Sequence, residues 1–160
     1  MQNNEQMPES IWADGIPENI KDEDKISNEQ LVIMAVDHIV KTIIIPKGFK
    51  LEQGFPRKDF PNIICKKDGV LYTITVIPSV YPNFVALNDD FRLQIVDISK
   101  KINATALFAP VGYRSVDEER AKAQLVLRGD VFQIAFPGFV VLTDEPNQDI
   151  RPVNNKLFRP

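Results

Sequence analysis

The segment 61–77 constrains the fold most, because it predicts two adjacent strands joined by a tight turn. Residues 62–66 and 70–77 are mainly apolar or β-favouring, and Asp68-Gly69 lies between them. Asp and Gly tolerate the positive φ angles of a hairpin turn, so this spacing is a strong hairpin signal. The second run is apolar or β-favouring on both faces, which is typical of a central strand covered on both sides.

Capping signals and helical periodicity predict three helices. A capping box at Ser27 opens a helix over 28–41, and a second helix is expected over about 89–102. A third helix is expected from a capping box at Ser115 to about Arg128. The stripes expected to face the core are Ile33, Val36, Val40 and Ile43 on the first helix and Phe91, Ile95, Ile98 and Ile102 on the second.

The remaining apolar runs predict strands that alternate with these helices. An edge strand is expected within 49–55, a buried strand over 105–111, and one or two strands over 131–142, while 78–88 is expected to be a loop. Alternating strands and helices imply parallel neighbours joined by right-handed crossovers, and the hairpin adds an antiparallel pair. We therefore expect an α/β (α+β mixed) domain with a central mixed sheet flanked by helices.

Charge divides the 160 residues into an acidic leader over 1–26, a domain over 27–143 and a polar tail over 144–160. Residues 1–25 hold seven acidic and two basic residues, whereas the remainder holds 17 basic and 15 acidic residues. Strong nucleic-acid binding requires many phosphate contacts, so this near-neutral body predicts weak or absent binding. Trp12 in the leader is interpreted as an anchor for its own chain.

Composition also limits the compartment and the metal chemistry. The longest apolar run, Ile43-Ile44-Ile45, is far shorter than the roughly 20 residues of a membrane span, and no secretory signal follows Met1. We expect a soluble, cytoplasmic protein. One cysteine and one histidine leave no soft-ligand metal cluster, so no cofactor is expected, although a carboxylate site for Mg²⁺ or Ca²⁺ remains open.

The hairpin, with Pro61-Asn62 at its start and Thr75-Val76-Ile77 on its second strand, resembles the central hairpin of the PD-(D/E)XK nuclease superfamily. The resemblance extends over about 28–142 and implies the restriction-endonuclease-like fold. In that superfamily an acid follows the proline, and an acid, one spacer and a lysine lie on the second strand. Asn62, Thr75 and Ile77 occupy those positions here, so the resemblance implies a degenerate site that lacks the charges needed to retain Mg²⁺.

Catalytic groups in that superfamily can move to neighbouring elements, and the candidates here are Asp59, Asp68, Lys66 and Glu29. Each also has an ordinary structural explanation, such as the preference for Asp in turns and for Glu in the first turn of a helix. Three weaker candidates are a lone His38, a buried Cys65, and a strand-to-helix turn over 110–114 that offers an anion site.

These observations favour a non-catalytic interaction or structural module with a protein partner or self-association and no membrane association. Fold analogy alone places it in a bacterial nucleic-acid-associated or defence assembly. Two alternatives stay open. One is a metal-dependent nuclease with relocated acids, and the other is a nucleic-acid binder that does not cleave.

Overall fold

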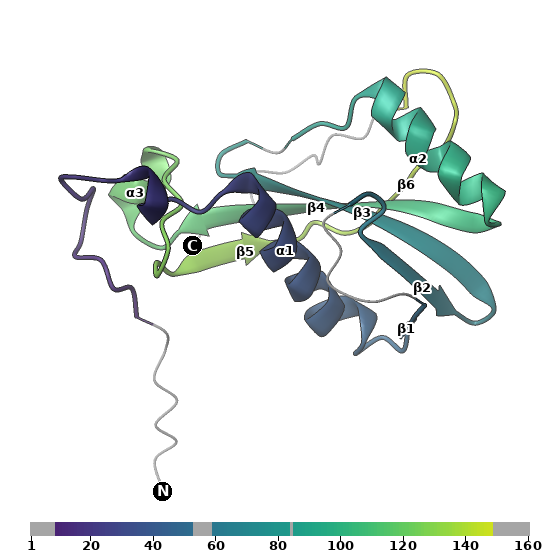
Figure 1. The fold of residues 1–160 in the computed structure, drawn as a ribbon, viewed down its shortest axis with the longest axis horizontal. Helices are drawn as coiled ribbons and strands as arrows, with labels where there is room; N and C mark the ends of the chain where they lie inside the picture. Colours follow the sequence, from purple (N-terminus) through teal and green to yellow (C-terminus); the bar gives the residue numbers. More distant parts are fainter. Residues whose placement is uncertain (1–8, 53–58, 84, 149–160) are drawn as a thin grey trace, which may run out of the picture.

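The computed structural model describes residues 9–52, 59–83 and 85–148 as a mixed sheet with a helix against each face (Figure 1). The strands follow the order β1-β2-β3-β4-β5, and β6 also pairs with β4. Only β3 and β4 pair in parallel among the described strands. This confirms the predicted fold class. The elements are β1 (Lys50–Leu51), β2 (Ile63–Lys67), β3 (Val70–Val80), β4 (Ala104–Ser115), β5 (Phe132–Ala135), β6 (Val140–Val141), α1 (Asn28–Ile39), α2 (Asp89–Lys101) and α3 (Glu118–Lys122).

The predicted hairpin is present. β2 and β3 pair antiparallel, with Ile63 opposite Ile74 at one end and Lys67 opposite Val70 at the turn. Asp68 has a φ of 51° and Gly69 a φ of 80°. Both central residues are therefore in the left-handed region that a two-residue hairpin turn requires. β4 pairs with residues 71–80 of β3 on its other side, so β3 has a strand on each side over residues 71–74.

β3 continues to Val80, so the prediction of a loop from residue 78 is wrong for its first three residues. The backbone N–H of Val76 points toward the β2 side, where Asn62 accepts it. The nitrogen of Pro78, two residues on, points the same way, beyond the start of β2. Pro78 therefore gives up no ladder hydrogen bond, which is why the strand tolerates it.

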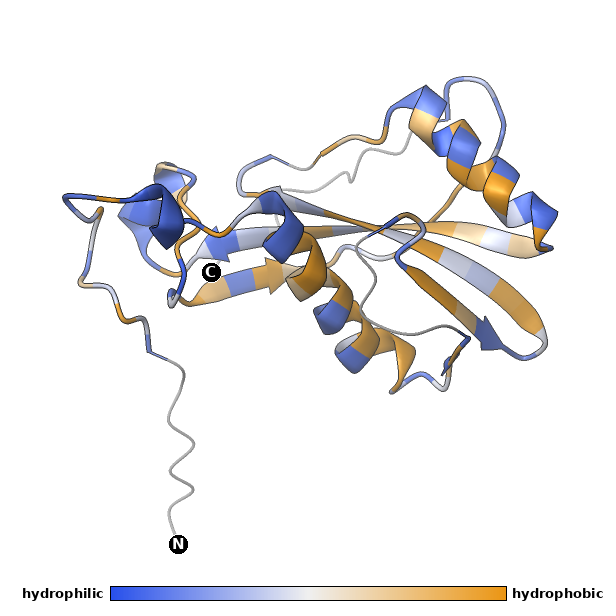
Figure 2. Cartoon of the chain, viewed as in Figure 1, coloured by the Kyte–Doolittle hydropathy of each residue, from blue (hydrophilic) through white to orange (hydrophobic). Residues whose placement is uncertain are grey.

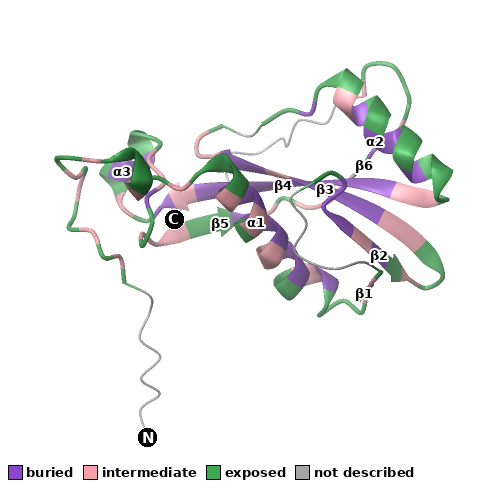
Figure 3. Cartoon of the chain, in the orientation of Figure 1, coloured by how far each residue is buried: buried purple, intermediate pink, exposed green. Residues whose placement is uncertain are grey.

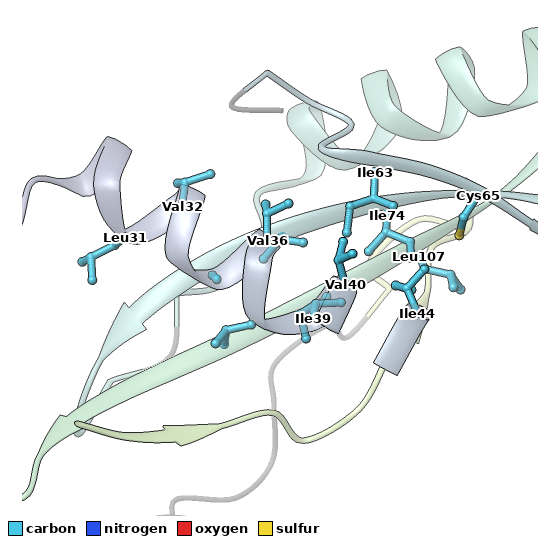
Figure 4. Close-up of a cluster of buried hydrophobic side chains, with 14 of the residues drawn as sticks. Leu31, Val32, Val36, Ile39, Val40, Ile44, Ile63, Cys65, Ile74 and Leu107 are labelled. Carbon is cyan, nitrogen blue, oxygen red and sulfur yellow. The ribbon is translucent and has the colours of Figure 1, made fainter. Parts of the chain in front are cut away.

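α1 begins where its capping box predicts. The Ser27 hydroxyl accepts the Gln30 backbone N–H at 3.2 Å, and the Gln30 side chain accepts the Ser27 N–H at 3.1 Å. The α-helix ends at Ile39 and a π-helical turn, Val40–Ile44, follows. Figure 4 shows the first core, in which α1 packs on one face of the sheet. Its buried side chains from the helix and turn are Leu31, Val32, Ala35, Val36, Ile39, Val40 and Ile44.

The stripe predicted for α1 is correct at Val36 and Val40, whereas Ile33 and Ile43 are only half-buried. The stripe predicted for α2 is wrong at Ile98 and Ile102, which are each 41% exposed. α2 covers the opposite face of the sheet, and its buried residues are Arg92, Ile95, Val96 and Ser99. Two of those four are polar, so a search for apolar periodicity could not locate this face.

The third helix, α3, is shorter than predicted and has a different N-terminal cap. α3 ends at Lys122 and does not reach Arg128. Asp117 caps it, since its Oδ1 accepts the N–H of Arg120 at 3.0 Å. Ser115 instead ends β4 and donates its hydroxyl to the Asp130 carboxylate at 2.7 Å.

The described part of the leader lies against the end of the domain formed by α3 and the segment before β5 (Figure 1). The indole Nε1 of Trp12 donates to the Arg128 carbonyl at 2.7 Å, and the Ile11 N–H donates to the Gly129 carbonyl at 3.0 Å. Trp12 therefore anchors its own chain, as predicted. The predicted leader residues 1–8, the tail beyond residue 148 and positions 53–55 of the edge strand lie outside the described residues.

Apolar residues line the inner faces of the helices and the strands beneath them (Figure 2), and these same faces are buried (Figure 3). Among the described helices, none has the length and apolar character to cross a membrane.

Candidate functional site

Asn62, which the resemblance to the nuclease superfamily would place at an acidic position, has a structural role in the hairpin. Asn62 lies one residue before β2 and is 1% exposed. Its Oδ1 accepts the backbone N–H of Val76 at 2.7 Å, and its own N–H donates to the Ile74 carbonyl at 3.0 Å. The side chain thus extends the hairpin by one rung, because the amide oxygen replaces a backbone carbonyl. This oxygen is committed to a buried donor that would otherwise be unsatisfied.

The two positions on β3 share one face, as strand alternation predicts, and that face packs against α2. Thr75 is 0% exposed and its Oγ1 has no hydrogen-bond partner in the described part of the chain. Ile77 packs against the second core, whose buried members are Leu87, Ile95, Val96, Ala106, Phe108 and Leu142. The locus is therefore closed and mainly apolar, and the hydroxyl of Thr75 lies between those of Thr73 and Ser79 on the same face of β3.

Thr73 lies two residues before Thr75 on the same face, and its hydroxyl, unlike that of Thr75, has a hydrogen-bond partner within the described residues. Its Oγ1 shares a 2.7 Å hydrogen bond with the hydroxyl of Ser99 on α2. Ser99 also donates to the Ile95 carbonyl at 2.7 Å. This short chain of hydrogen bonds joins α2 to β3, and it has a structural rather than a chemical function.

The candidates for relocated catalysis lie on separate elements. Asp68 occupies the hairpin turn and Asp59 is exposed before β2. Glu29 lies in the first turn of α1, and Lys66 is exposed on β2. No group of three or more His, Cys, Asp and Glu side chains within residues 9–52, 59–83 and 85–148 is arranged to hold a metal ion.

The three weaker candidates have structural explanations. Burial raises the pKa of the Cys65 thiol to about 11, with a smaller contribution from Glu52, so the thiol is inert in the first core (Figure 4). Partial burial lowers the pKa of His38, outweighing the nearby Asp37. The predicted turn at 110–114 is wrong, because these residues lie within β4 and Tyr113 is fully buried.

Sequence reasoning missed a buried ion pair that holds the leader in place. The Arg120 guanidinium donates from Nε to Asp130 Oδ2 at 3.1 Å and from Nη2 to Oδ1 at 3.2 Å. Its Nη1 donates to the carbonyls of Ala13 at 2.6 Å and Gly15 at 2.8 Å. Arg120 directly follows the acidic run Asp117-Glu118-Glu119, and nothing in that local sequence indicates its distant partners.

The acids of this cluster are held in their charged form. Burial acts to raise the pKa of Asp130, but hydrogen bonds from Ser115, Ser10, Val131 and Arg120 outweigh it and the pKa is lowered. The pKa of Asp117 is also lowered, first by the backbone N–H of Gly15 and then by that of Arg120. We call Arg120, Asp117, Asp130 and the carbonyls of Ala13 and Gly15 the leader clasp.

The surface also carries an open, largely apolar groove of about 410 Å³ between the first half of α1 and the start of β5. Its lining residues are Ile26, Gln30, Ile33, Met34, Arg128, Gly129, Asp130 and Phe132. A hollow of this composition suits contact with another apolar surface better than chemistry, since its one carboxylate is engaged in the leader clasp.

A family model described as "Domain of unknown function (DUF8840)" matches residues 29–142, which span α1 to the end of β6. No curated protein and no solved structure matches the chain.

Proposed function

The chain belongs to the DUF8840 family, a domain of unknown function, and we propose that it is a non-catalytic interaction module built on a nuclease-like scaffold. The order of elements supports the scaffold. A helix, a short strand, a hairpin, a second helix and a strand follow one another, and α2 connects the parallel β3 and β4. This is the order on which the resemblance to the PD-(D/E)XK superfamily depends.

The observation that carries the proposal is the burial of the three motif positions. Asn62 and Thr75 are inaccessible, and Ile77 contributes to the second core. A hydrolytic metal site needs carboxylates that face both the cation and the substrate phosphate. Asn62 and Ile77 instead complete a hairpin and pack against a core, and Thr75 is closed off from solvent, which argues against latent catalysis at this locus.

The interaction role is supported by exposed apolar residues near the C-terminal end of β4, where β5 pairs with it. Met34 beside the groove and Ile134 on β5 are exposed large hydrophobic residues. Surfaces of this kind commonly mark contacts with other protein chains. Together, a closed motif locus and an open apolar surface favour binding over cleavage.

One observation favours the nucleic-acid-binding alternative. Lys50 on β1 and Lys66 on β2 are direct cross-strand partners, and both are exposed. Like charges directly opposite each other destabilise a sheet, so a bound anion would relieve this pair. Glu52, however, lies on the same strand face as Lys50, which reduces the net charge there.

The proposal is tested by titrating the full-length protein with Mg²⁺ and Mn²⁺ in a calorimeter and by cleavage assays on DNA and RNA. We expect no metal binding tighter than millimolar and no cleavage, because the locus lacks the acids that retain a hard cation. Asp59→Ala and Asp68→Ala are the matched variants. Micromolar metal binding that either substitution abolishes, together with metal-dependent cleavage, would replace the proposal with a nuclease whose acids have moved.

A further inference from the structure

β5 forms an open edge of the sheet. It pairs with β4 on one side, from Ser115–Phe132 to Gly112–Ala135, and no strand among the described residues lies on its other side. The Val116 N–H donates to the Val131 carbonyl, which fixes the alternation of the ladder. The N–H and C=O groups of Phe132 and Ile134 therefore point outward, away from β4.

This edge lacks the devices that normally prevent strands from pairing with other chains. Natural edge strands carry lysine, proline, bulges or inward-pointing charges. The stretch 131–142 contains no charged residue, and its only proline, Pro137, follows β5. Ile134 leaves 40% of its surface exposed on the face of the sheet that α1 covers. The edge is thus suited to a partner that is itself a strand.

The apolar groove continues this edge on the α1 side. Phe132 contributes to both the edge and the groove, and Met34 and Ile33 supply the groove's helical wall. A strand added to β5 would extend the sheet beneath this hollow, and apolar side chains on its α1 face would enter it.

We propose that β5 pairs antiparallel with β5 of a second copy of this chain, about a two-fold axis that passes through Gln133. This dimer rests on the proposed interaction function and specifies its partner. The register pairs Phe132 of each protomer with Ile134 of its partner, so both outward residues of β5 exchange their N–H and C=O groups. Gln133 then lies opposite the same residue of the partner.

Charge and side-chain chemistry favour a second copy as the occupant. An isologous interface must be self-complementary, and an uncharged strand meets its copy without like-charge repulsion. The proposed register also creates two aromatic–β-branched cross-strand pairs between Phe132 and Ile134, a favourable combination on one sheet face. An unrelated acidic or basic peptide would find no complementary charge along β5.

Sedimentation velocity of the full-length protein tests this dimer. We expect wild-type protein to pass from one to two chains of 18.2 kDa as its concentration rises. Ile134→Lys should keep it monomeric, because a charge on the edge strand opposes pairing. Leu93→Lys is the matched control, since Leu93 is 42% exposed on α2, and it should dimerise as wild type does.

A cysteine variant tests the register independently of any effect of lysine on folding. Gln133→Cys should form an intermolecular disulfide on mild oxidation, because the two-fold pair is non-hydrogen-bonded and brings the Cβ atoms close. Gln94→Cys, exposed on α2, should not, and the native Cys65 is too buried to compete. A wild-type monomer at all concentrations, a dimer unchanged by Ile134→Lys, or equal cross-linking of both cysteine variants would each overturn the dimer. None of these outcomes would restore metal binding or cleavage, so they leave the non-catalytic proposal to its own test.

Discussion

Thr73 and Thr75 are buried two residues apart on one face of β3, yet only Thr73 has a hydrogen-bond partner among the described residues. An unsatisfied buried hydroxyl is costly, whereas replacing it with a methyl group removes the cost. We predict that Thr75→Val raises the free energy of unfolding by up to about 1 kcal/mol, and that Thr73→Val lowers it by about 1 kcal/mol. Urea unfolding of the two variants measures both changes.

The pair of threonine variants also distinguishes a structural locus from a functional one. If the hydroxyl of Thr75 served a bound ion or substrate, its removal would weaken ligand binding and would not stabilise the apo protein. Equal destabilisation by both substitutions would show that Thr75 has a partner that the described contacts do not include.

At this scale the sequence predicts where the motif positions lie but not what they do. Strand alternation is enough to place Thr75 and Ile77 on one face. The bond from Val76 to Asn62 depends on the exact start of β2, and a one-residue shift would abolish it. A side chain that caps a strand, as Asn62 does, produces no recognisable sequence pattern, so only the structure reveals it.

At the scale of elements, the leader clasp joins the N-terminal segment to α3 and to the loop before β5. Arg120 and Asp130 are both almost fully buried, and removing one partner leaves an uncompensated buried charge. We predict that Arg120→Met lowers the free energy of unfolding by about 3–5 kcal/mol. Lys101→Met, which breaks an exposed pair with Asp97, should cost less than about 1 kcal/mol.

The clasp should also respond to acid. The folded-state pKa values of Asp117 and Asp130 lie below their ordinary value of 3.8. Their contribution to stability is therefore present above pH 3.8 and is lost as the pH falls through the folded-state values. Trp12, the only tryptophan, reports leader docking directly. Its emission should shift to the red below pH 3.8 in wild type and already at neutral pH in Arg120→Met. A spectrum unchanged by Arg120→Met would show that the clasp does not hold the leader.

The helices show why element boundaries and faces were harder to predict than element order. α1 is buried through aliphatic residues, and apolar periodicity located half of its face correctly. α2 buries two polar residues, Arg92 and Ser99, and Arg92 donates to the carbonyl of Thr143. The polarity of the α2 sequence therefore does not indicate which side of the helix faces the core. α3 begins at Glu118 because Asp117 caps it while Ser115 bonds to Asp130, and it ends before Gln124, whose φ of 57° lies in the left-handed region. Long-range hydrogen bonds of this kind override local capping preferences.

Across the whole molecule, charge of opposite sign collects at opposite ends of the sheet. The acidic leader docks beside α3, while the β2–β3 turn and β1 lie at the far end (Figure 1). Among the described residues, 46–52 and 59–69 hold four basic and three acidic residues, against six acidic and two basic residues in 9–25. The described leader residues are docked and lie far from the lysines, so they are poorly placed to mask them.

This distribution predicts weak, salt-sensitive nucleic-acid binding at the lysine end and no cleavage. Few phosphates can be neutralised by Lys50, Lys66 and their neighbours, so affinity should fall steeply with salt and vanish near physiological ionic strength. In gel shifts at low salt, Lys50→Glu combined with Lys66→Glu should abolish binding. Lys21→Glu combined with Lys122→Glu makes the same change in net charge at the acidic end. This control should weaken binding less than the lysine-end variant, because its substituted charges lie at the opposite end of the sheet and the Debye length is about 30 Å at 0.01 M salt. Tight binding by the unmodified protein at physiological salt would instead identify a dedicated nucleic-acid binder, since a near-neutral body could reach such affinity only through a built recognition surface.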